Sequence, residues 1–315
     1  MLIQDPIYGK CEVSDQVLID LIESKSMQRL KGVAQYGWHN ENYPYPGFSR
    51  FEHSVGVMLL LKKLGADLKT QIAGLLHDIS HTAFSHCVDY ALGHEENEDF
   101  HDTIVDEYFE NSDTKNIIKN YNYDQKEIVD VDSFSIIKSN IPNASADNID
   151  YALREFEIWA NPGLSQDILN NLAVIDNEIV FKRFDLAKVF ADTFLRLQTE
   201  HWGGLDASSR HLKMAKVLKM ALDDQIIVKD DLFVDDQFVM NKLYKSNRKD
   251  LIDILENAHL KEVNQLLGKK IIKKFRYVDP KVLLDEDVKA LSTIDKKFVE
   301  NLNKHKENNL SGLQV

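Results

Sequence analysis

The chain has few of the residues that form disulfides and turns. Only two of its 315 residues are cysteine, Cys11 and Cys87, and they form no CxxC motif, which excludes a disulfide framework and a cysteine-based zinc site. Glycine and proline number 13 and 6, well below their usual shares of about 7% and 5%. Such a composition is typical of long helices and argues against a β-sandwich, a barrel or a glycine-rich nucleotide fold.

The sequence also lacks the marks of export and of membrane insertion. The first ten residues, MLIQDPIYGK, contain neither the basic region nor the apolar region of a signal peptide. The longest apolar run lies around Val57–Leu61 and is far shorter than the roughly 20 residues of a membrane-spanning helix. Together with the low cysteine content, this predicts a cytoplasmic protein with no membrane partner.

Positive charge is the other scarce feature. The 38 Lys and Arg residues face 51 Asp and Glu residues, so the net charge is −13. A protein this acidic is a poor candidate for holding nucleic acid by bulk electrostatics. Hydrophobic residues make up 43% of the chain, which is enough for a substantial buried core.

Hydrophobic periodicity predicts a mostly α fold in two parts. Residues 1–165 would form a helical core, and residues 166–315 a C-terminal helical accessory region that contains a small β element. The hairpin in this second part is expected over residues 173–184, around Asp176-Asn177, and a further strand over residues 269–280. Helices are expected over residues 14–23, 26–36, 50–64, 68–78, 146–158, 185–201, 206–222 and 249–267.

Histidine is concentrated in one part of the chain. Six of the 11 histidines fall between residues 53 and 101. The central pair, His77-Asp78, ends an apolar helical pattern, and at a helix end neighbouring side chains can turn toward one ion. The combination of an imidazole nitrogen and a carboxylate oxygen is suited to a divalent transition metal or to Mn or Mg, and not to a closed structural zinc site.

The pair His77-Asp78, taken alone, is also compatible with two other arrangements. An ordinary helix C-terminus favours histidine through the helix dipole. The spacing of His77 and His81 matches the HExxH zinc proteases, but Asp78 replaces the glutamate base, and no third ligand follows at the protease spacing. The residues that surround the pair decide among these possibilities.

Ordered motifs extend over the first half of the chain and resemble a known family. The series His53, His77-Asp78, Asp147 is similar to the H…HD…D signature of the HD-domain metal-dependent phosphohydrolases. The fuller set resembles the catalytic core of the deoxynucleoside triphosphate triphosphohydrolases that include the SAM-and-HD-domain enzyme. It covers roughly residues 1–165, with weaker similarity to about residue 280, and consists of QDPIYG (4–9), QRLK (28–31), QYG (35–37), YPG (45–47), RFEHSVG (50–56), QIAGLLHDISHTAFSH (71–86) and DNIDYALRE (147–155).

The resemblance implies a role for each matching residue. One divalent metal ion, whose identity among Mn, Mg, Zn, Ni, Co and Fe stays open, would be held by His53, His77, Asp78 and Asp147. Three histidines, His81, His86 and His101, would surround the scissile phosphate, and Asp89 would orient a catalytic histidine. The substrate would be contacted by Arg50, Gln35, Tyr151 and Asn148.

Two positions depart from the triphosphohydrolase pattern. Asn148 is neutral where those enzymes carry a lysine that grips the triphosphate, and Glu155 stands where an aspartate is usual. The resemblance therefore implies a metal-dependent phosphohydrolase of nucleotides, most similar to a deoxynucleoside triphosphate triphosphohydrolase, acting as a homo-oligomer on a small-molecule substrate. The alternatives are a phosphomonoesterase or phosphodiesterase acting on a smaller nucleotide or metabolite, and a nucleotide-binding regulatory protein.

Two stretches of like charge each fit two hypotheses. Residues 89–110 contain nine acidic and no basic residues, and residues 261–276 contain six basic residues and one acidic residue. Either stretch can form a solvated face or turn. Alternatively, the acidic stretch discourages polyanions, and the basic stretch is an arm that adds positive charge to the phosphate site of a neighbouring subunit.

Overall fold

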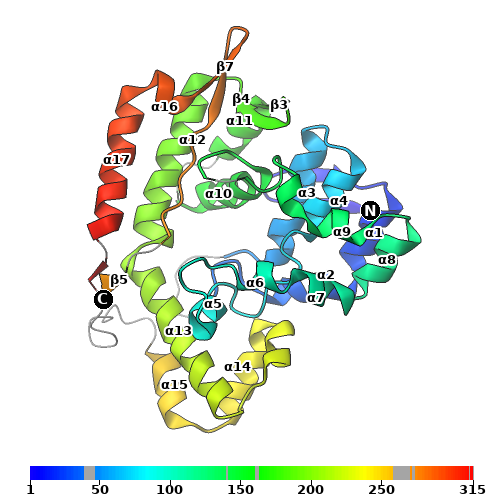
Figure 1. The fold of residues 1–315 in the computed structure, drawn as a ribbon, viewed down its shortest axis with the longest axis vertical. Helices are drawn as coiled ribbons and strands as arrows, with labels where there is room; N and C mark the ends of the chain where they lie inside the picture. The colour runs from blue at the N-terminus through cyan, green and yellow to red at the C-terminus, as the bar shows by residue number, and fades with distance from the viewer. Residues whose placement is uncertain are drawn as a thin grey trace.

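The protein is mostly helical, as predicted, and small β elements lie at its edges (Figure 1). The computed structural model describes residues 1–38, 47–139, 141–159, 163–257, 270–271, 274–311 and 313–314. The predicted YPG motif falls largely outside these residues, as do most of the basic stretch and the second half of the helix expected over residues 249–267. Within the described ranges, no helix is long and apolar enough to cross a lipid bilayer.

The first half of the chain combines an N-terminal β-hairpin with short and medium helices. The hairpin was not predicted, and it pairs Leu2 with Glu12 and Asp5 with Gly9. The elements of this half are β1 (Leu2–Asp5), β2 (Gly9–Glu12), α1 (Gln16–Glu23), α2 (Lys25–Gln28), η1 (Arg29–Gly32), α3 (Arg50–Lys63), α4 (Leu68–Leu76), α5 (Cys87–Leu92), α6 (Phe100–Thr103), α7 (Val105–Glu110), α8 (Thr114–Asn120), α9 (Gln125–Val129), η2 (Val131–Ser133) and α10 (Ala146–Trp159).

Helix α3 is the central element of this half. It begins at a capping box, in which the Ser49 side chain accepts from the Glu52 N–H and the Glu52 carboxylate accepts from the Ser49 N–H. All residues from His53 to Leu61 are buried, because α4 packs along one side of α3 and α10 along another. Gly56 permits the close approach to α10: a Cβ atom there would lie 2.1 Å from the Asp150 and Arg154 side chains.

The second half consists of long helices and a four-stranded sheet. Its strand order is β3-β4-β6-β7, in which β4 and β6 are parallel and the other pairs antiparallel. The elements are α11 (Leu164–Asn171), β3 (Leu172–Ile175), β4 (Glu178–Phe181), α12 (Phe184–Leu197), the π-helical turn η3 (Gln198–Trp202), α13 (Leu205–Asp223), η4 (Lys229–Phe233), α14 (Asp236–Lys245), α15 (Lys249–Glu256), β5 (Lys270–Ile271), β6 (Lys281–Leu284), β7 (Asp287–Ala290), α16 (Leu291–Ile294), α17 (Lys296–Ser311) and β8 (Leu313–Gln314).

The two halves share their buried apolar clusters. One cluster joins Val57 and Phe156 to Phe190 and Val282, and another joins Phe84 and Val88 of the first half to α13, α14 and α15. In Figure 1, α12 and α13 form a column beside the first half, and α10 lies between the two. The clusters therefore run across residue 165, where the sequence predicts a division of the chain.

Several element predictions can be compared with the structure. The hairpin around Asp176-Asn177 is confirmed as β3 and β4. The single helix expected over residues 26–36 is wrong: the helix ends early, because Val33 is extended and Ala34 forms a β-bridge with Ser49 that leads into α3. The strand expected over residues 269–280 is limited to β5 among the described residues, and β6 and β7 follow it instead.

Candidate metal centre and substrate pocket

Three helix ends bring the four predicted metal ligands together. His53 lies in the first turns of α3, and His77 caps the C-terminal end of α4 and is followed by Asp78. Asp147 lies in the first turn of α10. His53, His77 and Asp78 are buried, whereas the Asp147 side chain is 28% exposed, so the group is reached from one side only.

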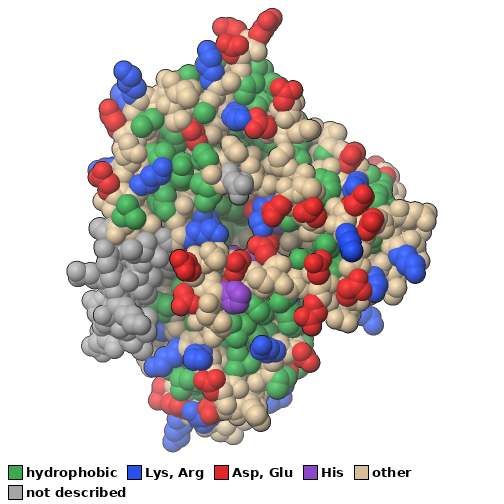
Figure 2. Space-filling view, viewed as in Figure 1, with side chains coloured by type: hydrophobic (Ala, Val, Ile, Leu, Met, Phe, Trp, Pro, Cys, Tyr) green, Lys and Arg blue, Asp and Glu red, His purple; other side chains and the backbone are tan. Residues whose placement is uncertain are grey.

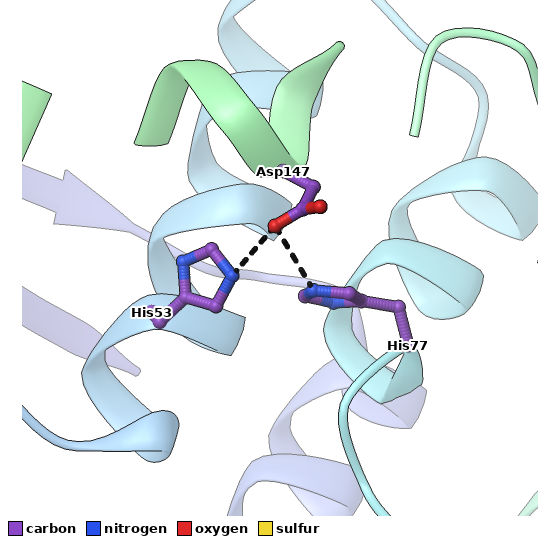
Figure 3. A group of neighbouring side chains, drawn as sticks. All are labelled: His53, His77 and Asp147. Carbon is purple, nitrogen blue, oxygen red and sulfur yellow. Dashed lines mark hydrogen bonds and ion pairs between the residues drawn. The ribbon is translucent and has the colours of Figure 1, made fainter. Parts of the chain in front are cut away.

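The donor atoms of these residues converge within a few ångströms. His53 Nε2 lies 3.1 Å from Asp147 Oδ1 and 3.7 Å from Asp78 Oδ2. His77 Nε2 lies 3.5 Å from Asp78 Oδ1 and 3.8 Å from Asp147 Oδ1. Figure 3 shows Asp147 placed between the two imidazole rings. One atom each of His53, His77 and Asp147 therefore lies within 4.8 Å of the others, a spacing that suits a single divalent cation, and Asp78 borders this group while also grouping with His81 and His101.

The outer ring nitrogens fix which way each imidazole points. His53 Nδ1 lies 2.8 Å from Asp150 Oδ2, and His77 Nδ1 donates to the Gly74 carbonyl oxygen at 2.8 Å. Each contact holds a proton on Nδ1 and points Nε2 at the centre, so that Nε2 can bind a metal ion once it carries no proton. His77 Nε2 is buried and has no hydrogen-bond partner among the residues that the structure describes. A buried nitrogen left in this state fits a metal ligand.

The electrostatics of the centre favour a cation. Burial opposes ionisation of Asp147, but the hydrogen bond with His53 and the nearby His77 ring hold its pKa far below the usual range. Burial likewise opposes ionisation of Asp78, but the neighbouring His77 and Arg50 lower its pKa. Burial disfavours a charged His53, yet hydrogen bonds to the carboxylates of Asp147 and Asp150 raise its pKa to about 9. The carboxylates are therefore ionised at neutral pH and stabilise positive charge between them.

A buried network holds His53 from behind. Asp150 contacts His53 and accepts from Arg154 Nε at 2.9 Å and from the Tyr8 hydroxyl at 2.8 Å. Arg154 in turn donates to Asp5 Oδ2 at 2.9 Å. The N-terminal hairpin thus supports the metal centre through Asp5 and Tyr8. Both residues belong to the QDPIYG motif, for which the sequence predicted no role.

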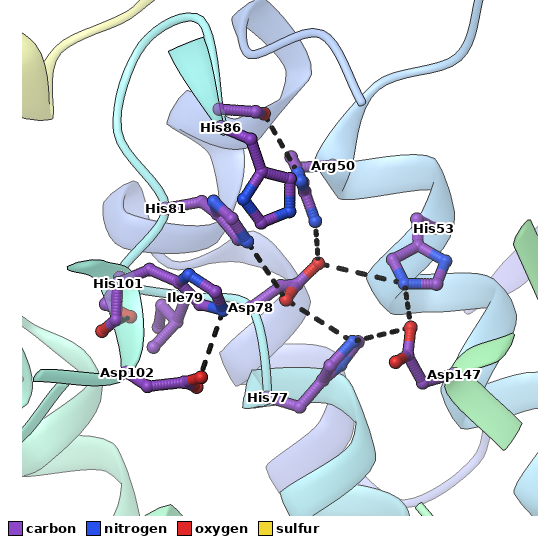
Figure 4. A network of polar contacts seen from close by, with 12 residues as sticks. Arg50, His53, His77, Asp78, Ile79, His81, His86, His101, Asp102 and Asp147 are labelled. Atoms are coloured by element: carbon purple, nitrogen blue, oxygen red, sulfur yellow. Dashed lines mark hydrogen bonds and ion pairs between the residues drawn. The ribbon is translucent and has the colours of Figure 1, made fainter. Parts of the chain in front are cut away.

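A second cluster of histidines lies beside the metal centre. Figure 4 shows Asp78 at the middle of the network, with His81 and Arg50 on the side away from Asp147. The His81 and His101 rings stack with their centroids 3.8 Å apart, and His81 Nε2 lies 3.4 Å from Asp78 Oδ1. Arg50 Nη1 donates to Asp78 Oδ2 at 2.5 Å. The structure therefore connects the predicted phosphate-site residues directly to a predicted ligand.

The three histidines of this cluster differ in their surroundings. Burial and the nearby Arg50 charge hold the pKa of His81 well below its usual range, and burial lowers the pKa of His101 to about 4. Both rings are neutral at pH 7. His86 is 24% exposed, and its Nδ1 lies 3.0 Å from Asp89 Oδ2. Since Asp89 also accepts from the Phe100 N–H, the carboxylate is fixed and directs His86 Nε2 outward.

A pocket opens beside these groups, on a face that is hollowed near its centre in Figure 2. Its walls include four residues of the predicted site: Arg50, His86, Gln35 and Tyr151. The second half of the chain supplies rings from η3 and three cations. These further lining residues include His201, Trp202, Arg210, Lys274 and Arg276. A pocket lined by cationic and aromatic side chains suits an anionic ligand that also carries an aromatic ring.

Asn148 lies apart from the pocket, unlike the other predicted substrate contacts. Its side-chain oxygen accepts from the Ser145 N–H at 3.0 Å, and its amide group donates to the Asn143 carbonyl at 3.0 Å. The side chain therefore stabilises the start of α10, and it does not line the pocket walls. The contribution of η3 was missed, because no local motif connects it to the histidines. Lys274 and Arg276 belong to the basic stretch, for which one hypothesis was an arm reaching the phosphate site of a neighbouring subunit.

Comparisons with known proteins agree with this geometry. The family model of the HD domain matches residues 50–140. The protein YdhJ of Bacillus subtilis is 33% identical over 295 residues, covering 91% of this chain and 90% of YdhJ. The metal-dependent phosphohydrolase cns2 of Cordyceps militaris is 37% identical over 155 residues, covering 49% of this chain and 45% of cns2.

A more limited similarity extends to a nucleotide hydrolase. The deoxynucleoside triphosphate triphosphohydrolase SAMHD1 homolog of Dictyostelium discoideum is 36% identical over 100 residues, which are 27% of this chain and 19% of that protein. The chain thus spans less than half the length of cns2 and about a fifth of the SAMHD1 homolog. It belongs to the HD-domain metal-dependent phosphohydrolases and is a hydrolase of that family.

Proposed function

We propose that this protein hydrolyses nucleotide phosphoesters, and that deoxynucleoside triphosphates are its preferred substrates. In this proposal His53, His77, Asp78 and Asp147 hold one divalent ion. The observation that carries the proposal is the position of this donor set next to a pocket lined by cations and aromatic rings. The ordered motifs and the partial similarity to a triphosphohydrolase support the choice of substrate.

Each residue near the pocket has a distinct task in this proposal. The metal ion, when bound, polarises a phosphoryl oxygen and lowers the pKa of water. Arg50 binds a phosphate oxygen through its donors on the side away from Asp78. His86, held at Nδ1 by Asp89, donates a proton from Nε2 to the leaving oxygen. His81 and His101, being neutral, donate hydrogen bonds to the phosphate. Gln35 and Tyr151 contact the sugar from the pocket wall.

A phosphomonoesterase or phosphodiesterase acting on a smaller nucleotide is the second candidate. It is favoured by Asn148, which is neutral and hydrogen-bonded to the start of α10. A nucleotide-binding regulatory protein is a third, but the complete donor set argues against it. The released product separates these candidates, because only the triphosphohydrolase reaction yields inorganic triphosphate.

The test is a panel of nucleotides incubated with the purified protein and Mn, Mg, Co, Ni, Fe or Zn, with the products identified. The proposal predicts inorganic triphosphate and a deoxynucleoside. Release of orthophosphate from a monoester, or of a phosphomonoester from a diester, without inorganic triphosphate supports the second candidate, and nucleotide binding without turnover supports the third. The double variant His77→Ala, Asp78→Ala should be inactive, whereas His94→Ala is the matched control, because His94 is partly exposed and pairs with Asp99.

A further inference from the structure

Two cations of the pocket come from a segment far from every catalytic motif. Lys274 and Arg276 lie between β5 and β6, in the irregular segment that runs beside α12 in Figure 1. They are separated from Arg50 by more than 200 positions in the sequence, yet all three line the same hollow. The basic stretch of the sequence therefore ends inside this chain's own pocket.

Within the described part of the chain, Arg276 is held in place by one ion pair. Its Nη2 forms an ion pair with Glu98, which also accepts from the Tyr90 hydroxyl at 2.9 Å. The side chain is 31% exposed. A guanidinium group has five N–H donors in a planar fork. One contact with Glu98 therefore fixes the group and leaves further donors for a ligand.

Lys274 has even less compensation for its charge. Its ammonium group donates to the Asn97 carbonyl at 2.9 Å, and no carboxylate of the described chain lies within ion-pair distance of it. Burial and the nearby Arg276 charge lower the pKa of Lys274. Two like charges are thus held close together at the edge of a pocket, an arrangement that an anion stabilises.

The remaining cations of the pocket are engaged elsewhere. Arg210 donates to Asp206 and to the Trp38 carbonyl, and Arg50 donates to Asp78 and to Ser85 and has its further donors assigned to the scissile phosphate. Asn148 contributes no charge. Additional phosphate groups beyond the one next to Arg50 and His86 therefore have Lys274 and Arg276 as their available cationic partners.

We propose that Lys274 and Arg276 bind the phosphates that are not attacked, and so select polyphosphate substrates over monophosphates. The inference rests on the proposed function, since it assumes that the scissile phosphate lies at Arg50 and His86. It deepens that function by assigning substrate selection to the C-terminal half, through residues that the catalytic motifs do not contain.

Binding of inorganic tripolyphosphate and of orthophosphate, measured by titration calorimetry, tests the inference without turnover. Lys274→Gln should weaken tripolyphosphate binding about tenfold, the value of one charge-assisted hydrogen bond, and should change orthophosphate binding less than about twofold. Arg276→Gln should weaken tripolyphosphate binding similarly, and Arg276→Lys should restore part of the loss because it keeps the charge beside Glu98. Lys289→Gln is the matched control, since Lys289 is exposed and pairs with Asp287.

The outcomes separate this inference from the proposed function. Tripolyphosphate binding that is unchanged in Lys274→Gln and in Arg276→Gln overturns the inference, even if the wild-type protein hydrolyses triphosphates. Binding that depends on Lys274 in a protein that hydrolyses no triphosphate supports the inference and contradicts the proposed substrate. If triphosphates are hydrolysed, Lys274→Gln should also raise their KM about tenfold.

Discussion

The two halves of the molecule contribute to the site by different means. The first half supplies the proposed metal ligands and the histidines from the ends of α3, α4 and α10 and from the segment between residues 81 and 101, and most of these groups are buried in a hydrogen-bonded network. The second half supplies the rings of η3 and the cations Lys274 and Arg276, which form the wall of the pocket. The groups proposed for catalysis therefore lie in one buried network of the first half. The pocket wall, in contrast, depends on how segments that are distant in the sequence pack together.

This difference leads to contrasting expectations for substitutions. Changes in the first half should reduce turnover or the free energy of unfolding, because each group there has several buried partners. Changes at Lys274 or Arg276 should act on affinity, because these side chains have few partners and face the pocket. Three predictions examine this contrast, beginning with the largest effect.

His86→Gln should lower kcat by about 100-fold or more, the usual contribution of a general acid. The reason is that His86, fixed by Asp89, is the partly exposed histidine of the cluster at the pocket. Steady-state kinetics on the best substrate of the panel measures the effect, and His94→Gln serves as the control. An unchanged kcat in His86→Gln would show that His86 is not the general acid.

Asp150→Asn should lower the free energy of unfolding by about 3 kcal/mol, because it leaves the buried Arg154 without one of its two carboxylates. Tyr8→Phe removes one hydrogen bond to the same carboxylate and should cost about 1 kcal/mol. Urea denaturation measures both. Equal stability of Asp150→Asn and the wild type would show that the network does not support the centre.

The buried carboxyl group of Glu155, near the border of the two halves, should make the free energy of unfolding depend on pH. Burial raises its pKa to about 8, from 4.5 in an exposed chain. Between these values the folded protein keeps a proton that the unfolded chain releases, so the free energy of unfolding falls as pH rises, by at most about 1.4 kcal/mol per pH unit. Urea denaturation at several pH values should show a shallower decline for Glu155→Gln. Identical slopes would mean that Glu155 is ionised in the folded state.

Much of the fold and of the metal centre was predictable from the sequence. The helix over residues 50–64 follows from an apolar run behind the capping pair Ser49 and Glu52, and the helix over residues 146–158 follows from amphipathic periodicity. These helices place His53 and Asp147 near their starts. The motif series predicted that these residues would meet His77 and Asp78, and the structure brings the four together. The motif series is readable in the sequence because the four proposed ligands lie at only three helix ends.

Other features could not be predicted because they depend on long-range pairing. Strand β6 pairs with β4 across about 100 residues, and neither strand specifies its partner by its own sequence. The support of His53 by Asp5 and Tyr8 joins the chain's first residues to α10. Asn148 was expected at the substrate, but the start of α10 offers closer partners for its amide. Lys274 and Arg276 reach the pocket only because their segment crosses beside Asn97 and Glu98.

The most direct test of the metal centre is the metal content of the protein after incubation with Mn and removal of unbound ions. Mass spectrometry of the metal should give one ion per chain for the wild type and for His94→Ala, and close to none for the double variant His77→Ala, Asp78→Ala. Circular dichroism establishes that each variant is folded. Equal metal content in the folded double variant and the wild type would contradict the assignment of His77 and Asp78 as ligands.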